Sequence, residues 1–359
     1  MNDNKQLCNY KNCKIKSKYF LNDKILCGTH FKLLYNNLYN IENSTLFLKD
    51  IKNLKFFSIK FKQTKKYDQI QYINDIIKKN INTKYNVINK LGEGEFGTVY
   101  LISDNISNGN EYALKIVIFN KEKIKSSNKA MNILYHERSI YNHLWVYNTQ
   151  SISSIITNND INQNNMFKYK KDEFTYLLLE YFPKILTKKI EKKLNIEDIK
   201  HIIKQLLISI KELHKCNYIH NDLKPDNIMF NNNNELKLID FGLCSRFLTP
   251  LKEHIIQKSM GMTGNERFAS IDALKKLSTS RRSDIESIGY IMIYLLNPKH
   301  KIFKFKNIEE NIENKNLLIN NNFIIDDEIS NINNLYFKEL KKYEFHTRPN
   351  YEYLISLFE

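Results

Sequence analysis

Residues 218–230 read Tyr-Ile-His-Asn-Asp-Leu-Lys-Pro-Asp-Asn-Ile-Met-Phe, and this stretch constrains the fold more than any other part of the chain. An acid (Asp222), a lysine two residues later (Lys224) and an asparagine five residues later (Asn227) lie between two apolar flanks. Because Pro225 cannot continue a helix, the stretch is predicted to be a loop that is held at both ends. One short loop therefore presents three polar side chains of different chemistry.

A second acid follows at a glycine turn. Residues 237–242, Lys-Leu-Ile-Asp-Phe-Gly, read as a strand that ends at Asp240. Phosphoryl transfer needs such a set, in which Asp222 would orient and deprotonate a hydroxyl and Lys224 would offset the charge of the γ-phosphate. Asn227 and Asp240 would hold Mg²⁺. The two segments, in this order, resemble the catalytic loop and the metal-binding turn of eukaryotic protein kinases.

A glycine-rich run precedes these segments. Residues 91–99 contain Gly-x-Gly-x-x-Gly, a pattern that dinucleotide-binding folds share with kinases. A dinucleotide-binding loop must open a helix, whereas the residues that follow here are β-rich, so we expect a hairpin turn between two strands. Glycines in such a turn let backbone amides close over phosphates. The residues expected to contact ATP there are Leu91, Gly92, Glu93, Gly94, Glu95, Phe96, Gly97, Thr98 and Val99.

Lys115 lies alone among the apolar residues of 111–117, which are predicted to form a third strand. A charge in that position normally needs a partner. The candidate is Glu137, within the predicted helix 131–144, because kinases use such an ion pair to place the α- and β-phosphates of ATP. The alternatives are a lysine that reaches the surface and a glutamate on the exposed side of its helix.

Residues 175–183 are an apolar strand that ends at a proline, and they resemble the strand and hinge of a kinase. That resemblance implies that Leu179 lines the back of the adenine pocket and that the backbone from Glu180 to Phe182 bonds adenine. A buried structural strand is the compatible alternative. Residues 196–216 carry apolar side chains at helical spacing and predict a long helix that leads into the catalytic loop.

Two later segments narrow the resemblance. Residues 262–272 contain Arg-Phe-Ala-Ser-Ile, and residues 280–290 read Ser-Arg-Arg-Ser-Asp-Ile-Glu-Ser-Ile-Gly-Tyr. Both resemble the casein kinase I and vaccinia-related kinase group, as does the closing segment 348–354. The resemblance implies an α+β, two-lobed kinase fold over residues 85–359, with a small β-rich N-lobe and a larger helical C-lobe. It also implies ATP and Mg²⁺ as cofactors, transfer of phosphate to protein serine or threonine, and a role for Asp284 in bracing the catalytic loop.

Three positions bear on regulation and substrate. Asn221 replaces the arginine of the family's His-Arg-Asp pattern, so no guanidinium can grip an activation-loop phosphate, and we hypothesise activity without loop phosphorylation. Asn265 stands where the group usually has threonine. Arg267 matches a basic residue that the family uses for acidic or already phosphorylated protein substrates. Residues 297–334 depart from the family pattern.

Three cysteines and a histidine near the N-terminus form two close pairs. Cys8 and Cys13 make Cys-x4-Cys, and after thirteen intervening residues Cys27 and His30 make Cys-x2-His. This set suits a tetrahedral structural Zn²⁺ site within residues 1–40, where the metal would supply the folding energy because few large apolar residues lie between the pairs. Three free thiols on a flexible arm are the alternative.

Positive charge is concentrated in the first quarter of the chain. The net charge is +16, and residues 1–84 carry 17 lysines against 6 acids. We interpret residues 41–84 as a basic linker, and the whole basic segment as a possible match for an anionic partner such as nucleic acid. A solvated lysine-rich face is the alternative.

The composition, 42% hydrophobic and 26% charged, is that of a globular protein. The longest apolar run, residues 288–296, falls short of the roughly 20 residues that a membrane span requires, and no signal-peptide core is present. We expect a monomer in a cytoplasmic setting, or in the host cytoplasm or virion if the source is viral. The rival functions are a pseudokinase scaffold, which the occupied catalytic positions disfavour, and a small-molecule kinase, a class that lacks the Ser-Arg-Arg segment.

Overall fold

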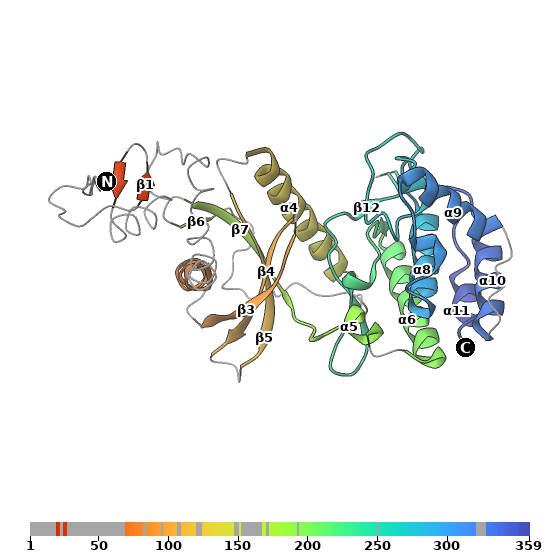
Figure 1. Cartoon of the computed structure of the whole chain (residues 1–359), viewed down its shortest axis with the longest axis horizontal. Coiled ribbons are helices and arrows are strands. Elements are labelled where there is room, and N and C mark those ends of the chain that lie inside the picture. Colours follow the sequence, from red (N-terminus) through yellow and green to blue (C-terminus); the bar gives the residue numbers. More distant parts are fainter. Residues whose placement is uncertain are drawn as a thin grey trace, which may run out of the picture. The chain divides into compact units, whose positions relative to one another are not determined.

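The computed structural model describes residues 19–21, 24–26, 69–81, 84–94, 96–105, 109–119, 124–146, 151, 167–169, 172–191, 194–249, 251–320 and 328–359. It divides into two compact units, drawn in Figure 1. The first unit contains residues 1–131 and 158–176, and the second contains residues 132–157 and 177–359. No helix in these described ranges is both long and apolar enough to cross a membrane.

The first unit is built on a sheet whose described strands follow the order β3-β4-β5-β7-β6. Strands β3 and β4 pair antiparallel and meet at Gly94 and Gly97, which confirms the predicted hairpin turn. The φ of Gly97 is +123°, and a Cβ there would lie 2.7 Å from the Ile116 carbonyl oxygen, so only glycine fits. The strands of the sheet are β3 (Tyr85–Gly94), β4 (Gly97–Asp104), β5 (Glu111–Ile118), β6 (Phe167–Tyr169) and β7 (Asp172–Glu180), and a separate pair consists of β1 (Tyr19–Leu21) and β2 (Lys24–Leu26).

Helical residues 69–80 pack on this sheet. Ile73, Ile76 and Ile77 are fully buried, as expected for one face of a helix. The Asn74 side chain accepts a hydrogen bond from the backbone N–H of Val87, with 2.7 Å between the two atoms. Residues 69–80 therefore form a helix whose apolar face is buried and whose Asn74 is tied to β3.

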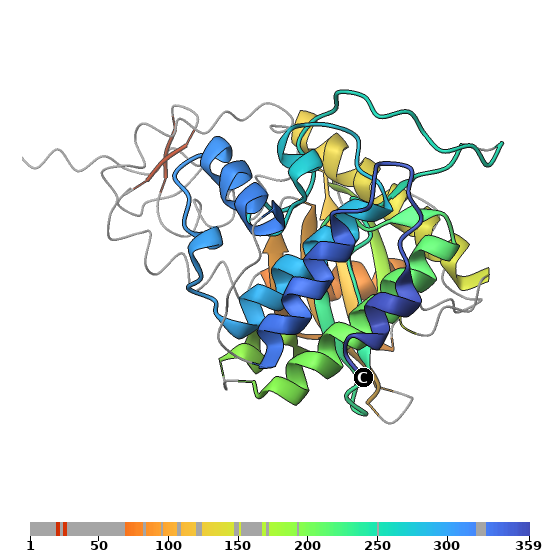
Figure 2. The same ribbon diagram turned by 90° about the vertical axis from the view of Figure 1, so that its right-hand side faces the viewer.

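The second unit is mainly helical, and Figures 1 and 2 show several of its helices lying side by side. Helix α6 (Ile196–Lys215) packs against α8 (Arg281–Leu296) and α11 (Tyr351–Ser356), and α10 (Glu328–Leu340) packs against α8. The remaining described helices of this unit are α5 (Leu186–Ile190), α7 (Ile271–Leu274), α9 (Ile308–Asn320) and the C-terminal part of α4 (Ile124–Val146), with short 3₁₀ turns η3 (Pro225–Asn227) and η4 (Lys301–Phe303).

Helix α6 shows why the prediction for residues 196–216 holds. The Asn195 side chain caps it by accepting from the N–H of Asp198 at 2.7 Å, and its last turn carries Lys215 where a cation suits the helix dipole. Its apolar face is buried throughout. The buried apolar residues of that face are Ile199, Ile202, Ile203, Leu206, Leu207, Ile210 and Leu213.

Candidate active site

A short hairpin in the second unit brings the two acidic motifs together. Strand β10 (Ile228–Phe230) starts directly after Asn227, and β11 (Leu236–Leu238) ends shortly before Asp240. The strands are antiparallel, with Ile228 opposite Leu238, so Asn227 and Asp240 lie at the same end. The N–H of Ile239 donates to the Asn227 carbonyl at 3.2 Å and closes this end.

The Asp222 carboxylate is held by the two other polar residues of its loop. Lys224 Nζ lies 2.6 Å from Asp222 Oδ2, and the Asn227 amide donates to the same oxygen at 3.1 Å. The Asn227 amide also donates to the Asp222 carbonyl at 2.8 Å. Both Asp222 and Asn227 are buried, while Lys224 is half-buried. The loop therefore groups Asp222, Lys224 and Asn227 as the sequence predicts.

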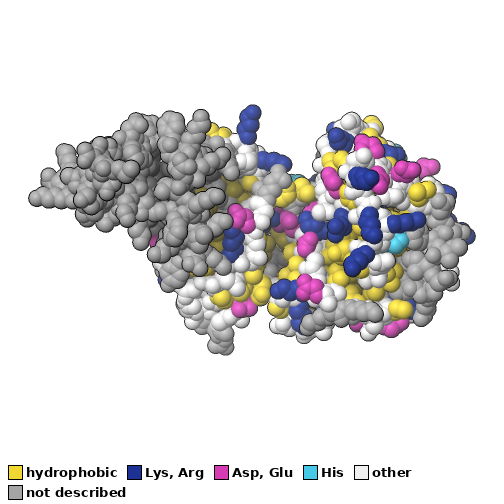
Figure 3. Space-filling model, in the orientation of Figure 1, with side chains coloured by type: hydrophobic (Ala, Val, Ile, Leu, Met, Phe, Trp, Pro, Cys, Tyr) yellow, Lys and Arg dark blue, Asp and Glu magenta, His cyan; other side chains and the backbone are white. Residues whose placement is uncertain are grey.

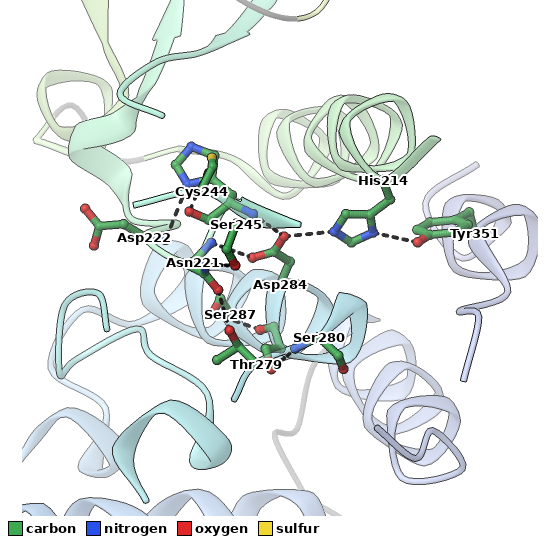
Figure 4. Close-up of polar contacts among 12 residues, drawn as sticks. His214, Asn221, Asp222, Cys244, Ser245, Thr279, Ser280, Asp284, Ser287 and Tyr351 are labelled. Carbon is green, nitrogen blue, oxygen red and sulfur yellow. Dashed lines mark hydrogen bonds and ion pairs between the residues drawn. The ribbon is translucent and has the colours of Figure 1, made fainter. Parts of the chain in front are cut away.

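The backbone of this loop is fixed from within the unit by Asp284 of α8 (Figure 4). Its carboxylate accepts from the backbone N–H of His220 at 2.7 Å and from that of Asn221 at 3.0 Å. Asp284 is 1% exposed, so it is an acid buried inside the unit and does not face solvent. The bracing role implied by the family resemblance has the geometry that it requires.

Asn221 uses its amide to join three segments, as Figure 4 shows. Its Nδ2 donates to the Leu243 carbonyl and to Ser245 Oγ, each at 2.9 Å. Its Oδ1 accepts from Thr279 Oγ1 at 2.7 Å. A neutral side chain thus ties the loop to the chain that follows Gly242, where the arginine of the family pattern would carry a charge.

His220 and Phe241 pack beneath the site. Their ring centroids are 5.3 Å apart, and Phe241 also meets Tyr141 of α4 edge-on at 5.1 Å. His220 Nε2 lies 3.3 Å from the Ile239 carbonyl oxygen. His220 thus packs against Phe241 and contacts the backbone of the residue before Asp240.

Glu137 of α4 lies beside the second acidic motif. It is fully buried, so the alternative of an exposed helix glutamate is wrong. A Cβ built on Gly242 would lie 3.5 Å from Asp240 Oδ1 and 3.9 Å from Glu137 Oε2, which places both carboxylates next to this turn. Ile133 Cγ2 would be only 2.8 Å from that Cβ, so Gly242 lets α4 approach closely.

The chain after this turn returns to the catalytic loop at Gly264. Its φ is +84°, and a Cβ there would lie 2.3 Å from the Asn221 carbonyl oxygen and 3.6 Å from Asp222 Oδ1. Only glycine lets the backbone pass this close. Residues 262–270, named here the substrate segment, therefore run directly past the candidate base.

Residues 85–355 match the protein kinase domain model. The chain belongs to the protein kinase family. A curated relative of this kinase is a probable casein kinase I homolog from Encephalitozoon cuniculi, 26% identical over 290 residues, which cover 77% of this chain and 84% of the relative. The kinase falls in the casein kinase I-like group that the sequence motifs indicated, and the β-sheet and helical units fit a two-lobed kinase fold.

The remaining predicted ATP contacts divide between the units. Lys115 lies in β5 of the first unit and is only 7% exposed, so a surface lysine is wrong, while its pairing with Glu137 stays a prediction. The predicted hinge residues Glu180 and Phe182 belong to the second unit. Of the glycine-rich turn, residues 91–94 end β3 and residues 97–99 begin β4, Phe96 lies in the turn, and Glu95 lies outside the described residues.

Membership in the protein kinase family implies that the chain uses ATP and Mg²⁺. The predicted ligands, Asn227 and Asp240, offer oxygen atoms of the kind that Mg²⁺ prefers. Because the Asn227 amide nitrogen faces Asp222, its oxygen must face the other way, and Asp240 supplies a carboxylate at the same end of the hairpin. Magnesium ions typically take one or two protein oxygens together with phosphates and waters. The described residues contain no group of three or more His, Cys, Asp or Glu side chains that could hold a metal without such help.

The proposed zinc ligands lie outside the described residues. The structure describes none of the four, which are Cys8, Cys13, Cys27 and His30. The zinc site in residues 1–40 therefore stays a prediction. The two cysteines that the structure does describe, Cys216 and Cys244, are buried thiols. Burial raises the pKa of Cys216 to about 11, which keeps its thiol protonated at neutral pH.

Proposed function

We propose that this kinase transfers the γ-phosphate of Mg·ATP to serine or threonine side chains of proteins. The observation that carries this is the cluster around Asp222, where a carboxylate is held by Lys224 and Asn227 and is passed at close range by the substrate segment. Lys224 favours serine and threonine over tyrosine, because tyrosine-specific relatives usually have alanine there.

In this proposal each residue has one task. Asp222 orients the acceptor hydroxyl and takes its proton as the new O–P bond forms and the bond to ADP breaks. Lys224 offsets negative charge on the transferred group, while Asn227 and Asp240 hold the magnesium ion. Bound Mg²⁺ would neutralise phosphate charge. Asp284 keeps the loop backbone in place, so that Asp222 needs no rearrangement before reaction.

The test compares wild-type kinase with Asp222→Asn and Lys115→Met, using Mg·ATP and casein. We expect both variants to lose transfer, with a fall of about 10²-fold to 10⁴-fold for the removal of the base. Asp226→Asn is the matched control, since Asp226 is an exposed acid of the same loop. A wild type that shows no more transfer than Asp222→Asn and a blank without enzyme would favour the pseudokinase alternative. Transfer to small molecules but not to proteins would favour the small-molecule kinase.

The substrates that we propose are acidic or already phosphorylated proteins. Arg267 is exposed in the substrate segment, and Lys and Arg side chains gather on one face of the second unit (Figure 3). Complementary charge raises the rate of encounter with such substrates. A panel of peptides that differ only in an acidic or phosphorylated residue before the acceptor serine tests this, with Arg267→Ala as the variant that should lose the preference.

We also propose that the kinase is active without phosphorylation of the segment after Gly242. The support is Asn221, whose amide already joins that segment to the catalytic loop. Phosphatase treatment should leave the activity unchanged. A mapped phosphate in residues 243–270 whose removal silences the enzyme would contradict the proposal.

For the N-terminal segments the sequence spacing supports a structural Zn²⁺ site in residues 1–40. The lysine-rich composition supports a basic linker in residues 41–84, of which residues 69–80 form the helix that packs on the sheet, before a kinase domain in residues 85–359. Metal analysis of the full chain should find one equivalent of zinc, which is lost in a Cys8→Ser variant. Binding of residues 1–84 to nucleic acid should weaken steeply with added salt if phosphates are the partner.

A further inference from the structure

Side chains of α9 hydrogen-bond to the backbone of the substrate segment. This helix lies within residues 297–334, the region that departs from the family pattern. Asn311 and Lys315 are one turn apart on α9, and both are fully buried. Asn311 Nδ2 donates to the Glu266 carbonyl at 2.9 Å. Lys315 Nζ donates to the same carbonyl at 3.2 Å and to the Ala269 carbonyl at 2.6 Å. Two backbone carbonyls of the segment are thus bound by one helix.

Apolar contacts of α9 support the same segment. Ala269 belongs to a buried cluster against which Ile308 and Ile312 of α9 pack, together with Met262 from the start of the segment. Hydrophobic packing alone is not directional. The hydrogen bonds from α9 therefore fix the orientation of the segment's backbone, which the apolar contacts cannot do.

The residue that directly follows the segment, Ile271, is held by α8. Glu286 Oε1 accepts from the backbone N–H of Ile271 at 2.7 Å and from Tyr290 O–H at 2.6 Å. The Tyr290 ring lies under Lys315, with Nζ 4.4 Å from the ring centroid. Arg282 Nη2 is 3.9 Å from Glu286 Oε2 and completes the buried polar network.

A lysine is costly in this place. Burial lowers the pKa of Lys315 to about 7, against the opposing effect of the Glu286 and Glu266 charges. An apolar side chain of similar length would fill the volume without that desolvation cost. An apolar side chain could not donate hydrogen bonds to the two carbonyls. The contribution that is specific to a lysine at this position is therefore its pair of hydrogen bonds to Glu266 and Ala269.

We propose that Lys315, assisted by Asn311, is a positioning residue for phosphoryl transfer to protein substrates. By fixing the Glu266 and Ala269 carbonyls, it sets the path of the substrate segment where that segment passes Asp222 at Gly264. This rests on the proposed function of the kinase. Lys315 does not touch the reacting atoms, and its effect reaches the acceptor hydroxyl through the segment.

The experiment uses the full chain with Lys315→Met, which keeps the length of the side chain but removes the donors. Hydrogen exchange of peptides covering residues 262–271 should become faster by about tenfold or more, as expected for the loss of buried hydrogen bonds to a charged group. The KM for a peptide substrate should rise by about tenfold, while the KM for ATP changes less than about twofold. Lys315→Arg, which keeps donors, should recover part of both effects.

Lys306→Met is the matched control, because Lys306 is an exposed lysine just before α9, and it should match wild type in every readout. If Lys315→Met does not fold, Asn311→Leu removes one of the bonds to Glu266 at lower cost and should shift exchange and peptide KM in the same direction. Unchanged exchange in residues 262–271, or equal changes in the KM values for peptide and ATP, would overturn the proposal. Wild-type chain without kinase activity would refute the proposed function instead, and the exchange result would still decide whether Lys315 fixes the segment.

Discussion

Asp284 and His214 share a buried hydrogen bond, with 2.8 Å between Oδ2 of the acid and Nε2 of the ring. The opposite ring nitrogen of His214 lies 2.6 Å from the Tyr351 hydroxyl. Because an ionised carboxylate only accepts, Nε2 carries the proton and Nδ1 accepts from Tyr351. The acid that holds the catalytic loop is thus held by His214 of α6, and His214 in turn is held by Tyr351 of α11 (Figure 4).

Asp284→Asn should lower both stability and turnover. An amide can replace only one of the two carboxylate oxygens, so one backbone N–H, of His220 or Asn221, loses its acceptor. We expect a fall of about 1–3 kcal/mol in the free energy of unfolding, measured in urea, and a lower kcat. Asp226→Asn in the same loop should change stability by less than about 0.5 kcal/mol. Equal behaviour of the two variants would contradict the bracing role.

Acid should destabilise the kinase through His214. Burial lowers the pKa of this ring below its ordinary value of 6.5, despite the favourable contact with Asp284. As pH falls below 6.5 the unfolded chain binds a proton that the folded chain does not, so the free energy of unfolding falls with pH. This contribution is fully present above 6.5 and is lost as the pH falls through the folded-state value.

Unfolding measured at several pH values checks this. The slope of stability against pH below 6.5 should be shallower in His214→Gln than in wild type, since the residue responsible is gone. His201→Gln, at an exposed position of the same helix, should keep the wild-type slope. Three identical slopes would exclude His214 as the source.

Gly264→Ala should damage the site far more than Gly261→Ala. At Gly264 a new methyl group meets a backbone oxygen at 2.3 Å and the φ is positive, whereas at Gly261 nothing lies within 4 Å. We expect Gly264→Ala to cost about 2 kcal/mol or more and to reduce kcat for proteins. Gly261→Ala should be nearly neutral, as judged by thermal unfolding and casein phosphorylation. Comparable losses in both variants would mean that the close approach is not what matters.

The stability of the kinase should depend on Asn221 in two ways, through the hydrogen bonds of its side-chain amide and through its backbone conformation. Its φ of 67° lies in the left-handed region, which glycine tolerates and alanine does not. Asn221→Gly and Asn221→Ala both lose the hydrogen bonds to Leu243, Ser245 and Thr279, and alanine should cost about 1 kcal/mol more. Urea unfolding of the two variants gives this difference directly, and an alanine variant as stable as the glycine variant would show that the backbone is not constrained.

The sequence allowed the core of the site to be predicted because its members lie on local motifs. Asp222, Lys224 and Asn227 share one loop, and a short hairpin adds Asp240, so spacing alone determined their neighbourhood. The hydrogen bond between Asn221 and Thr279 could not be predicted from spacing, because Thr279 lies 58 residues further along the chain and meets Asn221 only after folding. Lys315 was missed for the same reason, and because a lysine in an Asn/Lys-rich stretch gives no sign that it is buried.

The neutral amide of Asn221 has a consequence for how the kinase is governed in its cell. If, as we propose, the kinase needs no phosphate in the segment that Asn221 binds at Leu243 and Ser245, an upstream activating enzyme would have nothing to add there. The output of the kinase would then be set by the amount of enzyme that is made and by which proteins it encounters.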